Sequence, residues 1–534
     1  MTTLNMHKRT TFKRGLGLIV VIIVLAGSGL LSIWLGQDAN WDLSNYHFYN
    51  AFALVEHRLS WDVQPAQLQT YFNPLLDLPF YLLVTNFSAR TTAFFMGAIH
   101  GLNFILLLLI SNEFLKYVFS AAHKRWIWAG MISIVGFLAP VNYAEHGATF
   151  NDNMLSIPFL AAFLLIVKAK SSLGYRRTLL IFGSALLLGA ALGIKLTLAP
   201  YVLGMIALVL WMGDTWKNRL YYLGLWGGAV VIGFLSSAGW WMWALWQKFE
   251  NPLFPFYNSI FNSPFGTDRV FNGRGYGALQ NLFLTPFKLL FLDRTLIQWP
   301  IRDIRLALLF LLIVLFALLA IFLRKKLASQ KTFYATIALA SFASISYVAW
   351  FTNLYRYRYL QPLELLAPLI IFLVLTTILT YRKKLALVVF VGAAASILFF
   401  VELPQFGRIP FDGSYFGVEL PPLSKDQAVV FMDGGHNSFL VPFFPPDYRF
   451  IRVRGNLLGS GNKDPQEYLD SSFVQEFITP VFEAEEKMYL IRELPINDVL
   501  AAFDFREVQD SCAPIQQRLS RNKYVLCELE RIAE

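Results

Sequence analysis

The chain has 534 residues, of which 56% are apolar and 15% charged, and its formal net charge is +10. A soluble domain carries about 25% charged residues, so the composition excludes one and predicts an α-helical polytopic membrane protein. The positive charge does not indicate a nucleic-acid partner, because the basic residues gather in short connections between apolar segments.

The first apolar segment, residues 15–33, follows a basic N-terminus and is long enough to cross a bilayer. We expect an uncleaved span with a cytoplasmic N-terminus, although Ala26-Gly27-Ser28 leaves a cleaved signal peptide as an alternative. Further apolar segments bring the predicted number of spans to about eleven, at 92–115, 126–144, 153–167, 178–194, 196–213, 220–246, 306–323, 332–351, 361–380 and 385–401.

The positive-inside rule orients these segments. With a cytoplasmic N-terminus, the short basic connections all fall on the cytoplasmic side, which predicts an integral protein of a bacterial inner membrane. These connections contain Lys116, Lys124, Arg125, Lys168, Lys170, Arg176, Arg177, Lys217, Arg219, Arg324, Lys325, Lys326, Lys331, Arg382, Lys383 and Lys384.

Residues 71–87 are apolar, but they contain Asp77 and two prolines and are short for a span. Counting them as a crossing would reverse the side of every later basic connection, so we assign them to the membrane interface or to a re-entrant segment. The outer face then carries the loops 36–90 and 247–304, the link 144–153 and the chain after 402. We therefore expect a membrane domain at 1–401 and an extracytoplasmic domain at 402–534.

The segment 402–534 differs in character from the rest of the chain. AVVFMDGGHN, RFIRVRG, KMYLIREL and KYVLCELE are typical of short strands bounded by turn residues, which predicts a small α/β domain. The two cysteines, Cys512 and Cys527, form either a disulfide or two free thiols. In the same domain, the loop 434–438 (GGHNS) is either a simple turn or part of a binding site.

The first candidate for chemistry is Asp42 in WDLSNYHFYN, directly after the first span. At α-helical spacing, Asp42, Tyr46 and Tyr49 share one face. The structural alternative is that Asp42 caps a helix whose aromatic residues anchor it at the headgroups.

A second acidic group, Glu145, His146 and Asp152, lies in the short link 144–153 and so must sit near the outer membrane surface. Ionisable groups at membrane depth are costly and usually face a cavity or a partner, although Asp152 could simply cap the next helix. The sequence predicts no particular cofactor. A divalent metal ion at His47, His146 and nearby carboxylates stays an open alternative, although no metal-ligand spacing is present.

Three cations stand at outer turns, where the positive-inside rule makes basic residues sparse. They are Lys195, Arg356 and Arg358, the last two interleaved with Tyr355, Tyr357 and Tyr359. They could snorkel to the headgroups, but their position favours a bound anion such as phosphate. A carboxylate base beside such cations would suit transfer of a group from a lipid phosphate to a hydroxyl.

In this arrangement the chain resembles the GT-C glycosyltransferases, the superfamily of the lipid A aminoarabinose transferase and the protein O-mannosyltransferases. Asp42 with Tyr46 is similar to the acidic element of the family's first outer loop, and YFNPLLDLPFYLL resembles its Tyr-Phe-x-x-Pro segment. Asp152 is similar to the second outer Asp, LGIKLTLAP with Lys195 to the Thr-Lys-Gly stretch, and residues 358–362 to Arg-Tyr-x-x-Pro. Leu43 replaces a second acid found in many relatives, and Leu196 replaces the Gly after Lys.

The resemblance implies a membrane glycosyltransferase of cell-envelope glycan biosynthesis, which moves a sugar from a polyprenyl-phosphate donor to a lipid or glycan acceptor with inversion. It implies catalytic roles for Asp42 and Asp152. The expected substrate-binding residues are Tyr46, His47, Glu145, His146, Lys195, Arg356, Arg358 and Tyr359. Two other functions stay open, a transporter or flippase of a lipid-linked sugar and a non-catalytic partner in envelope assembly.

Overall fold

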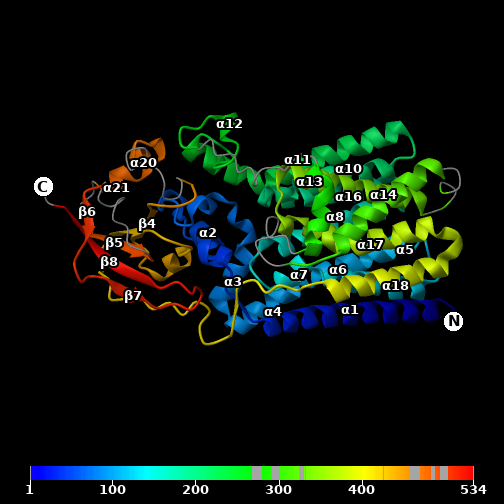
Figure 1. Cartoon of the computed structure of the whole chain (residues 1–534), viewed down its shortest axis with the longest axis horizontal. Coiled ribbons are helices and arrows are strands. Elements are labelled where there is room, and N and C mark those ends of the chain that lie inside the picture. Colours follow the sequence, from blue (N-terminus) through cyan, green and yellow to red (C-terminus); the bar gives the residue numbers. More distant parts are fainter. Residues whose placement is uncertain are drawn as a thin grey trace.

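The computed structural model describes residues 2–266, 280–291, 301–323, 327, 330, 332–424, 426–457, 469–482, 487–493 and 503–532. Much of the predicted loop 247–304 and most of the basic connection 324–331 therefore lie outside the described residues. Helices dominate the described chain, and one β-sheet lies near its C-terminus (Figure 1).

Within the described residues, nine helical segments are long and apolar enough to cross a membrane. One of them combines the consecutive helices α4 and α5. The nine are formed by α1 (Thr2–Leu35), α4 (Ala89–His100) with α5 (Leu102–Leu115), α8 (Asn151–Lys170), α9 (Gly174–Ile194), α11 (Trp216–Phe249), α14 (Arg305–Phe322), α16 (Phe333–Asn353), α17 (Gln361–Ile378) and α18 (Lys383–Phe400).

The two other predicted spans are also helical, but they are shorter. Segment 126–144 forms α6 (Ala122–Phe137) and α7 (Pro140–Ala144), and segment 196–213 forms η5 (Leu196–Leu198) and α10 (Ala199–Met212). Helix α6 packs against α5 and α17, and α10 packs against α16. The helical membrane fold is thus confirmed, whereas eleven crossings stay a prediction.

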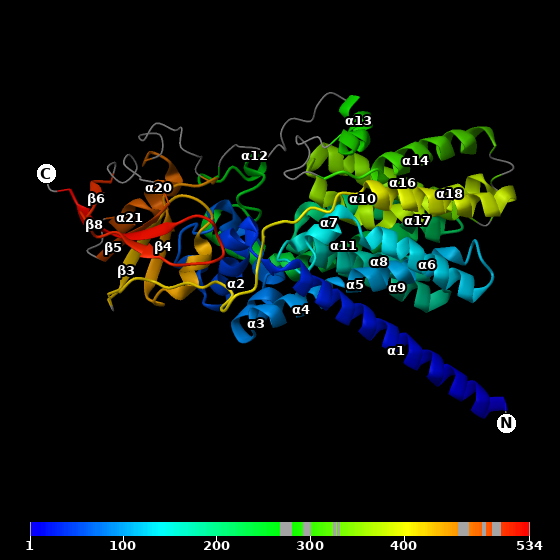
Figure 2. The same ribbon diagram turned by 60° about the horizontal axis from the view of Figure 1, so that its bottom comes forward.

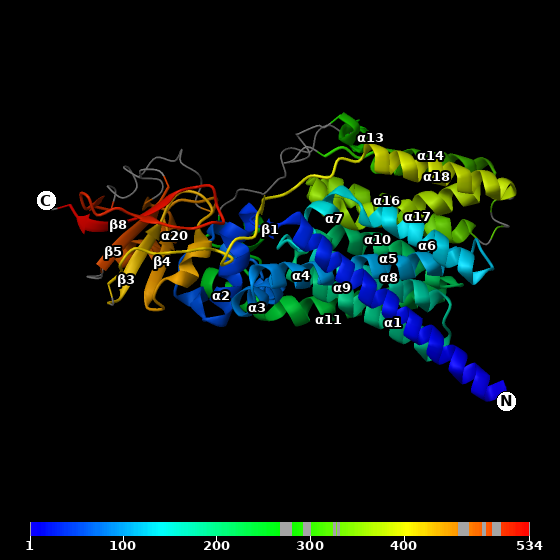
Figure 3. The ribbon, with the colours of Figure 1, turned by 90° about the horizontal axis from the view of Figure 1, so that it is seen from below.

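The helices form a bundle with the sheet beyond one end (Figure 1). Helix α1 contacts α4 near that end and diverges from the bundle toward the N-terminus (Figures 2 and 3). Its divergent part exposes large apolar side chains, among them Leu18, Ile22 and Ile23. Such a helix is suited to contact with lipid rather than water.

Short elements fill the predicted first outer loop, between α1 and α4. They are β1 (Gln37–Asp38), η1 (Leu43–His47), α2 (Phe48–Val55), η2 (Arg58–Ser60), η3 (Gln67–Tyr71), η4 (Pro74–Leu76) and α3 (Leu78–Asn86). With nine residues, α3 is only about 14 Å long and too short to cross a bilayer. This length agrees with the prediction that residues 71–87 do not form a span.

The C-terminal sheet has the strand order β4-β3-β5-β8-β6, and β7 also pairs with β8. Strands β4 and β5 lie on either side of β3 and are parallel to it, and β8 is antiparallel to β5. All five residues of β3 are buried, as expected for a parallel strand covered on both faces. The strands are β3 (Ala428–Met432), β4 (Tyr448–Arg452), β5 (Lys487–Arg492), β6 (Phe505–Glu507), β7 (Ala513–Ile515) and β8 (Tyr524–Arg531), so each of the four predicted strands is present.

Short helices complete this region, namely η9 (Ser438–Phe443), α20 (Ser472–Phe477) and α21 (Thr479–Phe482). Cys512 and Cys527 are joined in a disulfide, which resolves the two alternatives left by the sequence.

The sheet is not an isolated domain, because the first outer loop continues it. Val63 donates its N–H to the carbonyl of Phe450 (2.8 Å) and accepts from the N–H of Arg452 (3.0 Å), so it covers the edge of β4. An uncovered edge strand would offer unpaired backbone groups to other chains. Strand β2 (Arg408–Ile409), early in the C-terminal segment, pairs in turn with β1.

Helix α11 also reaches the sheet region. It has 34 residues and a length of about 51 Å, well beyond the roughly 30 Å of a hydrocarbon core. Phe249 at its end stacks on Phe473 of α20, with 6.3 Å between ring centroids. Helix α11 and the first outer loop therefore hold the sheet against the bundle.

Candidate active site

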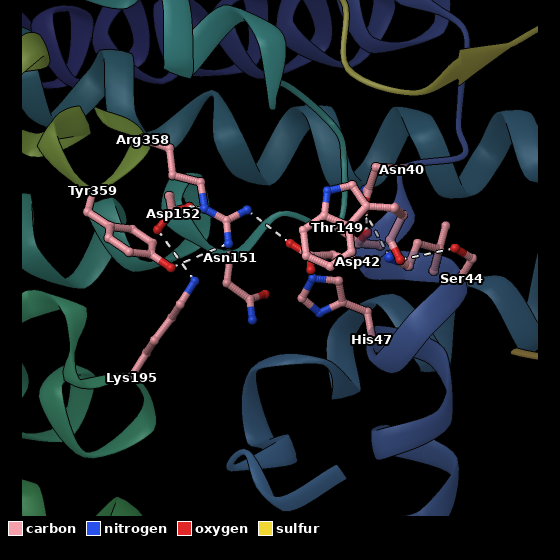
Figure 4. Close-up of polar contacts among 12 residues, drawn as sticks. Asn40, Asp42, Ser44, His47, Thr149, Asn151, Asp152, Lys195, Arg358 and Tyr359 are labelled. Carbon is pink, nitrogen blue, oxygen red and sulfur yellow. Dashed lines mark hydrogen bonds and ion pairs between the residues drawn. The ribbon is translucent and has the colours of Figure 1, made fainter. Parts of the chain in front are cut away.

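Four charged residues from separate parts of the chain form one network at the end of the bundle that faces the sheet (Figure 4). Arg358 Nη1 lies 2.9 Å from Asp42 Oδ2, and Arg358 Nε lies 3.6 Å from Asp152 Oδ2. Lys195 Nζ lies 3.4 Å from Asp152 Oδ1. Two carboxylates and two cations thus balance in charge.

The network is shielded from water. Asp42 and Asp152 are 1% and 6% exposed, and the side chains of Arg358 and Lys195 are each 17% exposed. Opposite charges attract more strongly in such an environment than at a wet surface, and loss of one partner leaves a costly unpaired charge.

Aromatic rings flank the two cations. The Arg358 guanidinium lies 5.2 Å from the ring centres of both Phe150 and Tyr359, and Lys195 Nζ lies 5.5 Å from that of Tyr359. These distances suit cation–π contacts. A small pocket opens beside them, lined by Asp152, Leu155, Thr197, Leu198, Tyr201, Tyr359 and Pro362.

The local structure at Asp42 differs from the capped α-helix considered above. The side chain of Asp42 makes no capping hydrogen bond, and Asn40 Oδ1 accepts the N–H of Leu43 instead (2.9 Å). Residues Leu43–His47 form a π-helical turn, whose hydrogen bonds run from residue i to i+5. Asp42 directly precedes this turn and His47 ends it, and the charge of Asp42 acts on Tyr46 within the turn.

Asp38, which sequence reasoning missed, ties the first outer loop to the link 144–153. Its Oδ2 accepts hydrogen bonds from the backbone N–H and the hydroxyl of Thr149, both at 2.8 Å. The amide of Asn40 also donates to Asp38 Oδ1 (2.7 Å). Because Asp38 is buried, these bonds fix the spacing between the segments that carry Asp42 and Asp152.

Asp152 and Lys195 are presented at helix ends. Asp152 lies in the first turn of α8, where Phe150 occupies the capping position without a side-chain cap, so the alternative of an Asp152 cap is wrong. Lys195 adopts an extended conformation (φ −148°, ψ 117°) between α9 and η5. The break in the helix lets Lys195 turn to Asp152.

Glu145 is fully buried, and neither of its oxygens has a hydrogen-bond partner among the described residues. Burial, followed by the nearby charge of Asp152, raises the pKa of Glu145 well above its ordinary value. Both causes favour the neutral acid over the carboxylate.

His146 does not join the network. Its Nε2 lies 2.9 Å from the backbone oxygen of Ser28 and 3.1 Å from the Ser28 hydroxyl, so it contacts α1 instead. Burial lowers the pKa of His146 to about 4. His146, which was predicted to bind the substrate, therefore packs between α1 and the link 144–153.

His47 pairs with Asp77, with 2.7 Å between Nδ1 and Oδ1. The side-chain amide of Asn151 lies 3.5 Å from the same oxygen. Burial raises the pKa of Asp77, and the charge and hydrogen bond of His47 oppose that shift. Sequence reasoning did not propose Asp77 or Asn151 as site residues, although a lone Asp within an apolar run was a usable signal.

Of the remaining predicted residues, Tyr46 and Tyr359 lie at the site, whereas Arg356 does not. Tyr46 is buried beside His47, with 4.0 Å between ring centroids, and burial and then Asp42 raise its pKa well above the ordinary value. Tyr359 lines the small pocket beside Arg358 and Lys195. Arg356 precedes η7 (Tyr357–Leu360), and its exposed side chain stands outside the ion-pair network around Arg358.

The sheet region contacts the Asp42 segment directly through the loop after β3. The rings of Trp41 and His436 lie 5.0 Å apart, and the Ser438 hydroxyl donates to the carbonyl of Asn45. Trp41 and His436 are both partly exposed, whereas Asp42, whose charge acts on His436, is buried. The loop 434–438 therefore borders the approach to Asp42.

The described residues offer no clear ligand set for the metal alternative. Their one close group of at least three His, Cys, Asp or Glu is Glu507 with Cys512 and Cys527, and these cysteines are bonded to each other.

The chain was also compared with known proteins, and no family model, curated protein or solved structure matches it.

Proposed function

We propose that the protein is a GT-C-like glycosyltransferase, which transfers a sugar from a polyprenyl-phosphate donor to an acceptor hydroxyl on the outer face of the membrane. The observation that carries this proposal is the buried network of Asp42, Arg358, Asp152 and Lys195 at one end of an apolar helical bundle. Such a network places a carboxylate base beside two cations that suit a phosphate.

The donor phosphate would bind at Arg358 and Lys195. Both cations lie near the ring of Tyr359, which lines a small pocket at this end of the helical bundle. This position lets a polyprenyl chain stay in the bilayer while its phosphate reaches the cations. Asp152 would hold Lys195 and Arg358 in place until the phosphate competes for them.

The acceptor would approach from the opposite side of Asp42. In an inverting displacement the acceptor oxygen and the leaving phosphate lie on opposite faces of the sugar. With the phosphate at Arg358, the acceptor side is the one bordered by Trp41 and His436. The loop 434–438 of the C-terminal region would thus take part in acceptor binding.

In the reaction, the acceptor oxygen forms a bond to the anomeric carbon while the bond from that carbon to the phosphate oxygen breaks. The electron pair leaves with the phosphate, whose charge Arg358 and Lys195 stabilise. Asp42 accepts the hydroxyl proton, through the oxygen that does not bind Arg358.

The test uses purified protein in lipid nanodiscs and a panel of radiolabelled polyprenyl-phosphate sugars. Wild type should consume one donor, and Asp42→Asn should abolish its consumption in protein that still folds, since Arg358 keeps its pair with Asp152. Asp412→Asn, at an exposed carboxylate, is the matched control and should be fully active. Near-normal turnover by Asp42→Asn would refute the assignment.

A transporter or flippase of a lipid-linked sugar is the second candidate, and one observation favours it. Asp303, Arg305 and Glu364 are completely buried at the ends of α14 and α17, with 3.0 Å between Arg305 Nε and Asp303 Oδ2. Intramembrane charges of this kind also occur along transport pathways. Translocation of a fluorescent polyprenyl-phosphate sugar across proteoliposomes, undiminished in Asp42→Asn, would favour the transporter. A non-catalytic assembly partner would instead keep its cellular function after replacement of Asp42, Asp152 and Arg358.

A further inference from the structure

The pair formed by His47 and Asp77 is buried, and the proposed reaction leaves it without a role. His47 is 0% exposed and Asp77 is 4% exposed, and 2.7 Å separates Nδ1 from Oδ1. Because a carboxylate only accepts hydrogen bonds, this contact favours the His47 tautomer with the proton on Nδ1. The ring lone pair that can accept a proton is then on Nε2.

Nε2 of His47 is buried and has no hydrogen-bond partner among the described residues. A buried polar atom without a partner loses its hydrogen bond to water and gains none in return, so such atoms call for an explanation. A neutral imidazole nitrogen in this state is a ready acceptor for a proton or a hydroxyl group. The Asp77 contact would stabilise the imidazolium that forms.

The π-helical turn gives this acceptor its position. Asp42 directly precedes the turn and His47 ends it, and the buried Tyr46 between them also lies within reach of the charge of Asp42. Figure 4 shows the His47 ring on the Asp42 side of the site, across from Lys195.

We propose that His47 is a proton acceptor downstream of Asp42, held in the required tautomer by Asp77. This inference rests on the proposed transferase function. The acceptor proton passes to Asp42 as the new glycosidic bond forms, and then from Asp42 to Nε2 of His47. Asp42 regains its charge and its ion pair with Arg358, and the imidazolium of His47 pairs with Asp77 until water removes the proton.

Several other groups act on this pair. Asp42 and Tyr46 lie on its own segment, Asn151 reaches Asp77 from α8, and Lys195 acts on Asp77 from the end of α9. Arg358 of η7 acts on Tyr46 and binds Asp42. A rise of activity with pH could come from any of these groups. It can therefore be assigned to His47 only if substitution of His47 removes it.

The first experiment measures the pH profile of donor consumption. Wild type should show a rising limb, which His47→Gln should remove while lowering kcat about 10- to 100-fold with little change in the donor KM. Asp77→Asn should lower kcat and displace the limb. His57→Asn, at an exposed histidine of the same loop, is the control and should keep the wild-type profile.

The second experiment needs no sugar donor. In protein carrying ¹⁵N-labelled histidine, NMR should show His47 protonated at Nδ1 and unprotonated at Nε2 above neutral pH, with the signal assigned by its absence in His47→Gln. Asp77→Asn should shift the tautomer toward Nε2–H. A wild-type Nε2–H tautomer would overturn the proposal.

The two proposals fail differently. Turnover in Asp42→Asn would defeat the transferase mechanism. An inactive Asp42→Asn together with a wild-type pH profile in His47→Gln would defeat the His47 relay alone.

Discussion

Arg358 and Asp42 are 316 residues apart in the chain, and 2.9 Å separates Nη1 of the one from Oδ2 of the other. This ion pair joins the end of the first span to the turn before α17. It also decides which of two neighbouring arginines belongs to the site, since Arg356 remains exposed. This one contact should therefore contribute both to stability and to the proposed function. Substitutions can separate its effect on the melting temperature from its effect on sugar transfer.

Arg358→Gln should both inactivate and destabilise the protein. It leaves the carboxylate of Asp42 buried without its nearest cation, and breaking a buried pair costs about 3–5 kcal/mol. The double variant Asp42→Asn with Arg358→Gln removes both charges. It should recover most of the melting temperature but no sugar transfer. A double variant as unstable as Arg358→Gln alone would show that the pair does not set stability.

Asp62→Ala should loosen the first outer loop from the sheet. Asp62 binds Arg58 through two contacts of 2.7 and 2.9 Å, and Arg58 also donates to the carbonyl of Pro446 (2.9 Å). Because Arg58 and Asp62 are buried, the loss should cost about 3–5 kcal/mol. Hydrogen exchange of the β4 amides should rise accordingly.

The control for that variant is Glu528→Ala. Glu528 pairs with Lys487 at 2.9 Å, but both side chains are more than two-fifths exposed. Surface pairs contribute about 0–1 kcal/mol, so exchange at β4 should hardly change. Equal effects of the two substitutions would contradict the docking role of Asp62.

His146 should make the protein acid-sensitive. Burial lowers its pKa from 6.5 to about 4, so between these pH values the unfolded chain binds a proton that the folded protein excludes. Stability should therefore fall as the pH drops from 6.5 to 4, by up to ~3 kcal/mol. Melting temperatures of His146→Gln should fall less over this range, and those of His123→Gln, at an exposed histidine, should follow wild type.

The disulfide should stabilise the C-terminal sheet. Cys512 and Cys527 enclose a loop with a sequence separation of 15, for which chain entropy predicts a contribution of about 3 kcal/mol. Replacing both cysteines with serine should increase hydrogen exchange in β7 and β8, and dithiothreitol should have this effect only on wild type. If hydrogen exchange in β7 and β8 changed neither in the double variant nor in wild type with dithiothreitol, strand pairing alone would hold these strands.

Much of the fold was predictable because hydropathy and alternation are local properties. Each predicted span is helical, and AVVFM and KYVLCELE are strands. Asp42, Asp152, Lys195 and Arg358 were also named from the sequence, since charges beside apolar segments are conspicuous. The role of Asp77 was less visible, because its partner His47 lies 30 residues away on another element.

The sequence by itself determined a helical membrane protein with a small sheet region and a set of charged residues at the ends of its spans. Only the tertiary structure decided that Arg358 rather than Arg356 enters the network, that a π-helical turn follows Asp42 and ends at His47, and that the sheet rests on the first outer loop. The physical reason is the distance along the chain over which each property is determined. Transfer of an apolar segment out of water depends on that segment alone, whereas the direction of a buried charge depends on partners supplied by distant parts of the chain.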